Sequence, residues 1–95
     1  MTPLERLQFW VANQCDGDWE HGTGVRIETL DNPGWMVTID LSATPLADVG
    51  FPRVIQQRSE IDWVQIEVSG GSFIGCGGSG NLTELIERFL DLVGV

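Results

Sequence analysis

The chain contains no lysine and no tyrosine, only two cysteines, a single histidine, and no long apolar run. Two cysteines are too few for a scaffold held together by disulfides. No apolar stretch approaches the ~18 residues that a membrane helix requires. The first residues also lack the basic start and apolar middle of a signal peptide, so we expect a cytoplasmic protein with free thiols.

Acidic residues dominate the charge of the chain. Fourteen Asp and Glu side chains stand against five bases, all of them arginine, and the formal net charge is −9 at pH 7. Such a surface repels nucleic-acid phosphates and anionic membranes and attracts cationic partners. We therefore expect neither nucleic acid nor membrane as a partner. Because acidity also serves solubility, charge alone does not identify the partner.

The two ends of the chain have helical patterns. Thr2-Pro3-Leu4-Glu5 has the pattern of a capping box with proline in the first turn. Leu4, Leu7 and Val11 then recur at helical spacing, which predicts a core-facing helix to about residue 14. Asn81 is predicted to cap a second helix with a broad apolar face.

Between these helices, apolar and polar residues alternate in five short runs, the period of half-buried strands. Asp31-Asn32-Pro33-Gly34 is predicted to form a type II turn with positive φ at Gly34, and Gly70-Gly71 a hairpin turn. Short connections favour antiparallel pairing, because parallel pairs need long crossovers. The expected strands are residues 25–29, 35–41, 53–58, 61–68 and 73–76, with residues 42–52 as a loop.

The sequence thus predicts one α+β domain over residues 1–95. We expect an antiparallel meander sheet of about five strands, with the N-terminal and C-terminal helices packed on one face. The opposite face would remain exposed. It would carry polar strand residues together with one tryptophan: Arg26, Glu28, Thr38, Asp40, Gln65, Glu67 and Trp63.

The segment Cys15–His21 concentrates three carboxylates, a thiol, an imidazole and an indole within seven residues. Its carboxylates have the one-three-five spacing of a calcium loop, but the sixth and twelfth positions are His21 and Ile27 instead of glycine and glutamate. A zinc site would have only one histidine and one nearby cysteine as ligands, and carboxylates alone would have to complete the tetrahedral set. We therefore expect no metal and no cofactor. Cys15 and His21 could also form a nucleophile with its base, which keeps an enzymatic alternative open.

The segment Gly75–Gly80 matches G-x-G-x-x-G between a strand and a helix. A dinucleotide site would need a further strand after that helix, and a phosphate loop would need a lysine. The pattern therefore favours a flexible connection. Cys76 followed by glycines is also similar to the loops of cysteine phosphatases and sulfurtransferases, but Leu82 stands where their anion-binding arginine is usual.

The chain resembles the immunity protein 53 family of bacterial polymorphic toxin systems. The resemblance implies a cytosolic protein that binds and neutralises a cognate toxin domain, without enzymatic activity. It brings no assigned functional residues. The residues that carry it are Gln14–His21, Gly24-Val25, Ile27–Trp35, Arg58-Ser59-Glu60 with Asp62-Trp63, and Gly77–Leu82.

We expect the toxin to be a basic protein, such as a nuclease, held by an acidic surface that contains tryptophan. Two alternatives are a small cysteine-dependent enzyme, sulfurtransferase-like or hydrolytic, that uses Cys15 or Cys76, and a structural or regulatory subunit that pairs with itself as a homodimer. The candidate toxin-binding residues are Asp16, Asp18, Trp19, Glu20, Glu60, Asp62, Trp63 and Glu67.

Overall fold

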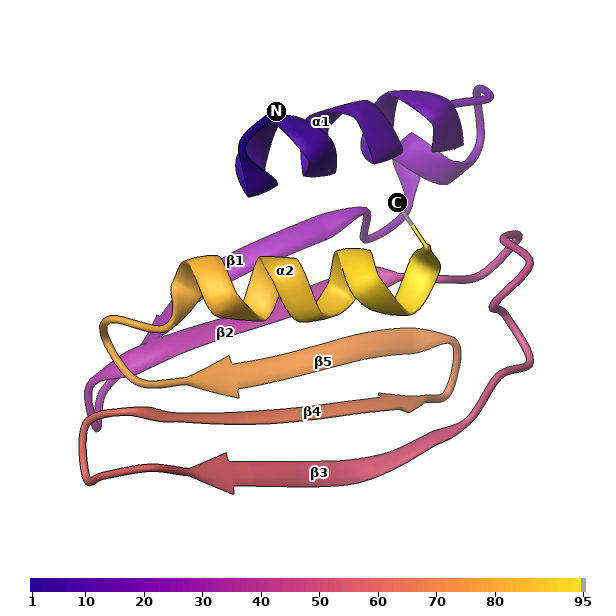
Figure 1. Ribbon diagram of the computed structural model, residues 1–95. Coiled ribbons are helices and arrows are strands. Elements are labelled where there is room, and N and C mark those ends of the chain that lie inside the picture. Colours follow the sequence, from indigo (N-terminus) through magenta and orange to yellow (C-terminus); the bar gives the residue numbers. More distant parts are fainter. Residues whose placement is uncertain (95) are drawn as a thin grey trace.

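A computed structural model describes residues 1–94 of the chain as an antiparallel sheet with a helix at each end of the sequence (Figure 1). The predicted α+β class is confirmed, and the predicted domain over 1–95 extends one residue past those described. None of the described helices is long and apolar enough to cross a membrane. The elements are α1 (Pro3–Gln14), the 3-10 turn η1 (Trp19–His21), β1 (Val25–Leu30), β2 (Gly34–Asp40), β3 (Phe51–Gln57), β4 (Trp63–Ser69), β5 (Ser72–Gly77) and α2 (Leu82–Val93).

The five strands follow the order β1-β2-β5-β4-β3, and every neighbouring pair is antiparallel. Residues 41–50 carry the chain from β2 to the far edge of the sheet, so that β5, rather than β3, pairs with β2. β3 begins at Phe51, inside the segment predicted as a loop. One row of paired residues crosses all five strands: Glu28, Met36, Cys76, Gln65 and Ile55.

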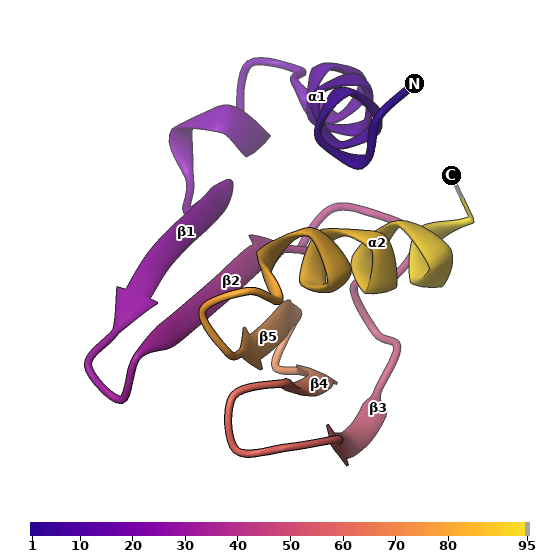
Figure 2. The same ribbon diagram turned by 60° about the vertical axis from the view of Figure 1, so that its left-hand side comes forward.

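Both helices lie on the same face of the sheet (Figure 2). α2 packs on β2, β4 and β5, and α1 packs on α2. Phe89 of α2 lies at the centre, in edge-to-face contact with Trp10 at 4.8 Å and Phe73 at 5.2 Å between ring centroids. Burial of each such side chain stabilises the fold by about 1.5–3 kcal/mol. The buried apolar residues are Leu7, Trp10, Trp19, Val37, Ile39, Leu41, Val64, Ile66, Val68, Phe73, Leu85, Ile86, Phe89 and Leu90.

The N-terminal helix has the predicted start but a narrower buried side than predicted. Thr2 Oγ1 accepts from Glu5 N at 3.1 Å and Glu5 Oε1 accepts from Thr2 N at 2.9 Å, which completes the capping box. Leu7 and Trp10 are buried, whereas Leu4 is 54% exposed. Since α1 rests mainly on α2, only a narrow stripe of the helix reaches the core, and the prediction that Leu4 faces the core is wrong.

Two further local predictions are wrong because each residue interacts with a more distant segment than the pattern suggests. Gly34 is the first residue of β2 and is absent from the glycines with positive φ; a Cβ there would lie 2.2 Å from the carbonyl oxygen of Gly77. Asn81 occupies the N-cap position of α2, but its side chain makes no capping hydrogen bond, because it binds the β3–β4 turn instead. The predicted hairpin turn at Gly70-Gly71 is confirmed by positive φ at both residues.

Candidate functional site

The segment Cys15–His21, hereafter the acidic loop, is held in shape by two of its own carboxylates. Asp16 Oδ1 accepts from the backbone N–H groups of Asp18 at 3.0 Å and Trp19 at 3.1 Å. The Glu20 carboxylate accepts from Asp16 N at 3.0 Å and Gly17 N at 2.9 Å. Hydrogen bonds from backbone N–H groups lower the pKa of both side chains. The largest contribution comes from the N–H of Trp19 for Asp16, and from the N–H of Glu20 itself for Glu20. The loop therefore carries fixed negative charges.

Trp19 joins the acidic loop to the core. Its side chain is 6% exposed, and its indole Nε1 donates to the carbonyl oxygen of Asp40 at 3.1 Å. Its ring meets Trp10 edge-on, with 5.7 Å between centroids. The indole thus points inward and offers no face to a partner. Asp18 is exposed, and its carboxylate makes no hydrogen bond or ion pair with the residues that the structure describes.

Asp62 belongs to a polar network that ties the β3–β4 turn to α2. Arg58 donates to both carboxylate oxygens of Asp62, from Nε at 3.0 Å and from Nη2 at 2.8 Å, and also binds Glu84 of α2. Asn81 Nδ2 donates to Asp62 Oδ1 at 2.9 Å. Arg58 first, and Asn81 second, lower the pKa of Asp62 to about 2. We call Arg58, Asp62, Asn81 and Glu84 the Arg58 clamp.

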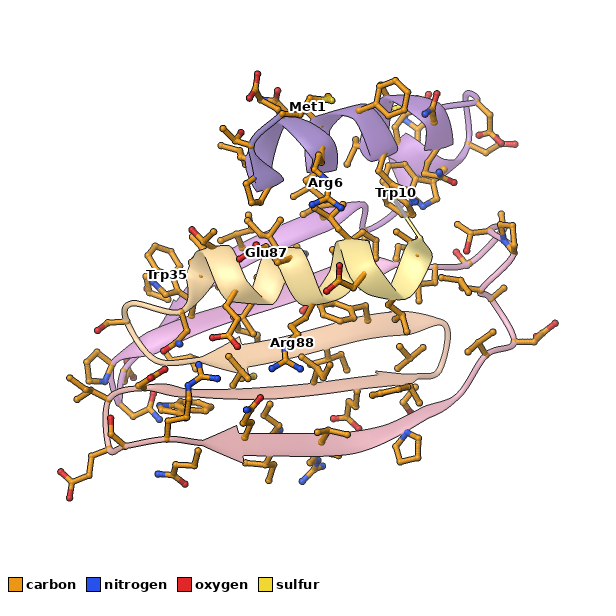
Figure 3. All side chains as sticks on the ribbon, in the orientation of Figure 1. Met1, Arg6, Trp10, Trp35, Glu87 and Arg88 are labelled. Atoms are coloured by element: carbon orange, nitrogen blue, oxygen red, sulfur yellow. The ribbon has the colours of Figure 1, made fainter. Side chains whose placement is uncertain are left out.

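Arg88 extends the clamp toward the edge of the sheet. It projects from α2 over the strands (Figure 3), where it binds Gln56 of β3 and Glu84 of its own helix. The sequence patterns did not indicate this network. The opposite charges of Arg58 and Asp62, four positions apart, are a local signal for it, but nothing local points to Glu84, which lies 26 positions after Arg58.

The other predicted contact residues do not gather with the acidic loop. Glu60 is exposed in the β3–β4 turn. Trp63 is half-buried on the sheet face opposite the helices, as is Glu67, whose Oε1 lies 3.8 Å from Arg53 Nε. The β3–β4 turn and the acidic loop lie at opposite ends of the molecule (Figure 1). The eight predicted residues therefore form two separate groups.

The glycine-rich segment after β5 is packed against its neighbours. Gly77 and Gly78 are buried, and a Cβ at Gly78 would lie 2.2 Å from the carbonyl oxygen of Ile61. On the other side, Trp35 Nε1 donates to the carbonyl oxygen of Ser79 at 2.9 Å. These glycines let three segments approach one another at one end of the sheet. Residues 34–35, 58–63 and 77–82 meet there, and all of them except Ile61 are among those that carry the family resemblance.

The two thiols lie in different environments. Cys15 is exposed, and its Sγ donates to the carbonyl oxygen of Val11 at 3.3 Å. Cys76 is half-buried on the sheet face opposite the helices, where burial and then the charge of Glu67 raise the pKa of its thiol. A raised pKa disfavours the thiolate that a nucleophile requires. Within residues 1–94, no three His, Cys, Asp or Glu side chains gather in a group that could hold a metal ion.

No ion pair within residues 1–94 joins a base to an acidic-loop carboxylate, although the nearby His21 acts electrostatically on Glu20 and contributes to its lowered pKa. The ion pairs join Arg53 to Glu67, Arg58 to Asp62 and Glu84, and Arg88 to Glu84. All of them lie on the β3, β4 and α2 side of the molecule. The carboxylates of Asp16 and Glu20 are instead bonded to backbone N–H groups, and that of Asp18 makes no bond within residues 1–94.

The structure thus presents an exposed anionic loop that is held by its own hydrogen bonds and by a buried indole. The chain belongs to the immunity protein 53 family, whose sequence model matches residues 4–94. It is therefore an immunity protein of a toxin system, with a toxin protein as its partner, and the family suggests an inhibitor without enzymatic activity. This confirms the resemblance found in the sequence. No curated protein and no solved structure matches the chain.

Proposed function

We propose that this immunity protein neutralises its toxin by direct binding, in the cytoplasm, and that the toxin contacts the outer side of the acidic loop. One observation carries the proposal. Asp16, Asp18 and Glu20 are all exposed within five residues, and no ion pair among residues 1–94 compensates them. A partner with a basic surface gains most from such a loop, because opposite potentials accelerate encounter and align the two surfaces.

The internal bonds of the loop favour tight binding. The carboxylates of Asp16 and Glu20 accept hydrogen bonds from four backbone N–H groups, and the buried Trp19 connects the loop to β2 through its bond to Asp40. Because the loop is ordered before the toxin arrives, association does not have to supply that ordering free energy. Asp18 is then the side chain with a carboxylate free to meet an arginine or lysine of the toxin.

The toxin that fits this surface is a basic protein, and a nuclease with a phosphate-binding cleft has the required charge. The second group of candidate contacts is the β3–β4 turn with the adjoining sheet, where Glu60 is exposed and Trp63 half-buried. Asp62 contributes less there, since Arg58 and Asn81 already occupy its oxygens. We place the primary contact at the acidic loop because its charges are not paired with bases.

The test compares three equal charge changes at exposed acids: Asp18→Arg in the acidic loop, Glu60→Arg in the β3–β4 turn, and Asp48→Arg in the connection after β2. Each variant is mixed with the cognate toxin domain, and the association rate is measured at low and high salt. We expect Asp18→Arg to slow association at least tenfold at low salt, and high salt to reduce the difference. Asp48→Arg should have a much smaller effect.

A larger effect of Glu60→Arg than of Asp18→Arg would move the interface to the β3–β4 turn. Equal rates for all three variants and the native protein would exclude acidic steering. A further variant, Cys15→Ser with Cys76→Ser, tests the enzymatic alternative: it should protect cells from the toxin as well as the native protein does. Loss of protection, with the fold retained, would favour cysteine chemistry.

A further inference from the structure

The sheet face opposite the helices, hereafter the open face, is not covered by any described element (Figure 2). Strand pairing places Ile55, Gln65, Cys76, Met36 and Glu28 in one row across this face. The next row contains Glu67, Ile74, Thr38 and Arg26. Most of these side chains are half-buried, and Ile55 is 59% exposed. The open face is therefore a broad surface with apolar residues at its centre and edge.

The open face is almost neutral, unlike the rest of the molecule. It carries two arginines, Arg26 and Arg53, and three acids, Glu28, Asp40 and Glu67, a net charge of −1. Subtracting these from five bases and 14 acids leaves three bases and 11 acids elsewhere, a net charge of −8. Asp40 lies at the rim, where its carboxylate accepts from Ser42 N at 2.9 Å.

This charge distribution favours a second copy of the chain, and not the basic toxin, as the partner of the open face. The net negative charge on the rest of the molecule repels a second copy of the chain and attracts a basic toxin. A near-neutral face with apolar residues among its polar ones attracts neither cations nor anions strongly, and its charge does not repel its own copy. In a two-fold arrangement, Arg26 and Glu28 at one edge and Arg53 and Glu67 at the other can meet groups of opposite charge on the second copy.

The size of the face is sufficient for a weak dimer. Five strands spaced ~4.8 Å apart and six residues of ~3.3 Å each cover about 500 Å² per copy. Two such faces bury about 1,000 Å² in total, which is near the lower limit for a specific interface. Sheets pack face to face in this manner in β-sandwiches. We propose that the open face binds the open face of a second copy, in a reversible homodimer with the helices and the acidic loops outside.

The test measures sedimentation of the native protein and of three variants over a concentration range from about 1 to several hundred µM. Ile74→Glu places a charge at the centre of the open face. Ile55→Glu and Val54→Glu form a matched pair, because the two residues are neighbours on the edge strand β3, are 59% and 44% exposed, and point to opposite faces of the sheet. Circular dichroism confirms that each variant is folded.

We expect the native protein and Val54→Glu to approach twice the mass of one chain at high concentration. Ile74→Glu and Ile55→Glu should raise the dimer dissociation constant at least tenfold, since each would bury unpaired carboxylates. Because Ile55 is largely exposed, its variant keeps the test valid even if Ile74→Glu does not fold.

A native protein that stays monomeric throughout the concentration range would overturn the proposal. Equal loss of dimer in Ile55→Glu and Val54→Glu would overturn it as well, because the edge of β3 would then be the interface. A monomeric native protein in which Ile55→Glu abolishes toxin binding would assign the open face to the toxin instead. None of these results depends on whether the acidic loop binds the toxin.

Discussion

Trp19 and Asp40 connect the acidic loop to the sheet: the indole Nε1 of Trp19 donates to the backbone carbonyl of Asp40 at 3.1 Å, across 21 positions of sequence. Asp40 is the last residue of β2, so the bond joins the end of a core strand to the turn η1. The inward position of Trp19 thereby determines how the neighbouring carboxylates are presented outward. Loop geometry and core packing depend on the same side chain.

Replacing Trp19 should therefore destabilise the protein and loosen the loop together. Trp19→Ala removes a buried indole and should lower the free energy of unfolding by about 3–5 kcal/mol. Trp19→Phe keeps an aromatic ring but loses the hydrogen bond to Asp40, with an expected loss of about 1–3 kcal/mol. Urea denaturation of both variants measures these losses.

Replacing Trp63 provides a control for the stability lost on replacing Trp19. It is half-buried on the open face and supplies no ring contact to the core aromatics. Trp63→Phe should therefore cost less stability than Trp19→Phe. If Trp19→Phe is as stable as the native protein, the bond to Asp40 contributes nothing to stability and the loop is held by its carboxylates alone.

The Arg58 clamp should make stability sensitive to acid. Arg58, and then Asn81, lower the pKa of Asp62 from its ordinary value of 3.8 to about 2. Because the folded pKa lies below the unfolded one, the folded state binds fewer protons, and the stabilisation is complete above about pH 5. It is lost as pH falls from about 4 to 2. Asp62→Asn should thus be less stable than the native protein at pH 7, and the difference should narrow over that acid range.

Denaturation midpoints measured between pH 7 and pH 2 test this expectation, with Glu60→Gln as the matched control. Glu60 is two residues from Asp62, is exposed, and makes no hydrogen bond or ion pair with residues 1–94. Its variant should follow the native protein at each pH. A constant difference between Asp62→Asn and the native protein down to pH 2 would show that the lost stability comes from packing and not from charge.

Local patterns in the sequence were sufficient for much of the fold. The Thr2 capping box, the alternation in the strands and the Gly70-Gly71 turn each depend on residues close in sequence, and the structure confirms them. The open face was predicted for the same reason, since alternate residues of a strand lie on opposite faces. The exposed carboxylates of the acidic loop are likewise where a polar segment should lie.

What the sequence did not reveal depends on contacts between distant segments. Pairing of β2 with β5 follows from how residues 41–50 cross the sheet, which no local pattern specifies. Trp19 lies in a segment without periodicity, so the sequence left open whether its indole covers the core or binds the toxin. The partner of Arg58 in α2 is decided by the packing of that helix on the sheet. The separation of the eight candidate residues into two groups has the same origin.

Gly78 lies in the segment that matches G-x-G-x-x-G, and its substitution tests whether close packing requires glycine there. A Cβ at this position would lie 2.2 Å from the carbonyl oxygen of Ile61 and 2.8 Å from Asn81 Oδ1, so Gly78→Ala must displace the β3–β4 turn or α2. We expect it to lower the free energy of unfolding by about 3 kcal/mol or more, at or above the upper part of the usual range for overpacking.

The control is Gly80, two residues later, where φ is not positive and an added Cβ would meet no atom within 4 Å beyond its chain neighbours. Gly80→Ala should therefore be neutral or stabilise by up to ~1 kcal/mol through the unfolded state. Urea denaturation of the two variants measures the contrast, and similar stability for both would mean that the segment is pliable and that its glycines are not required by contact with the turn.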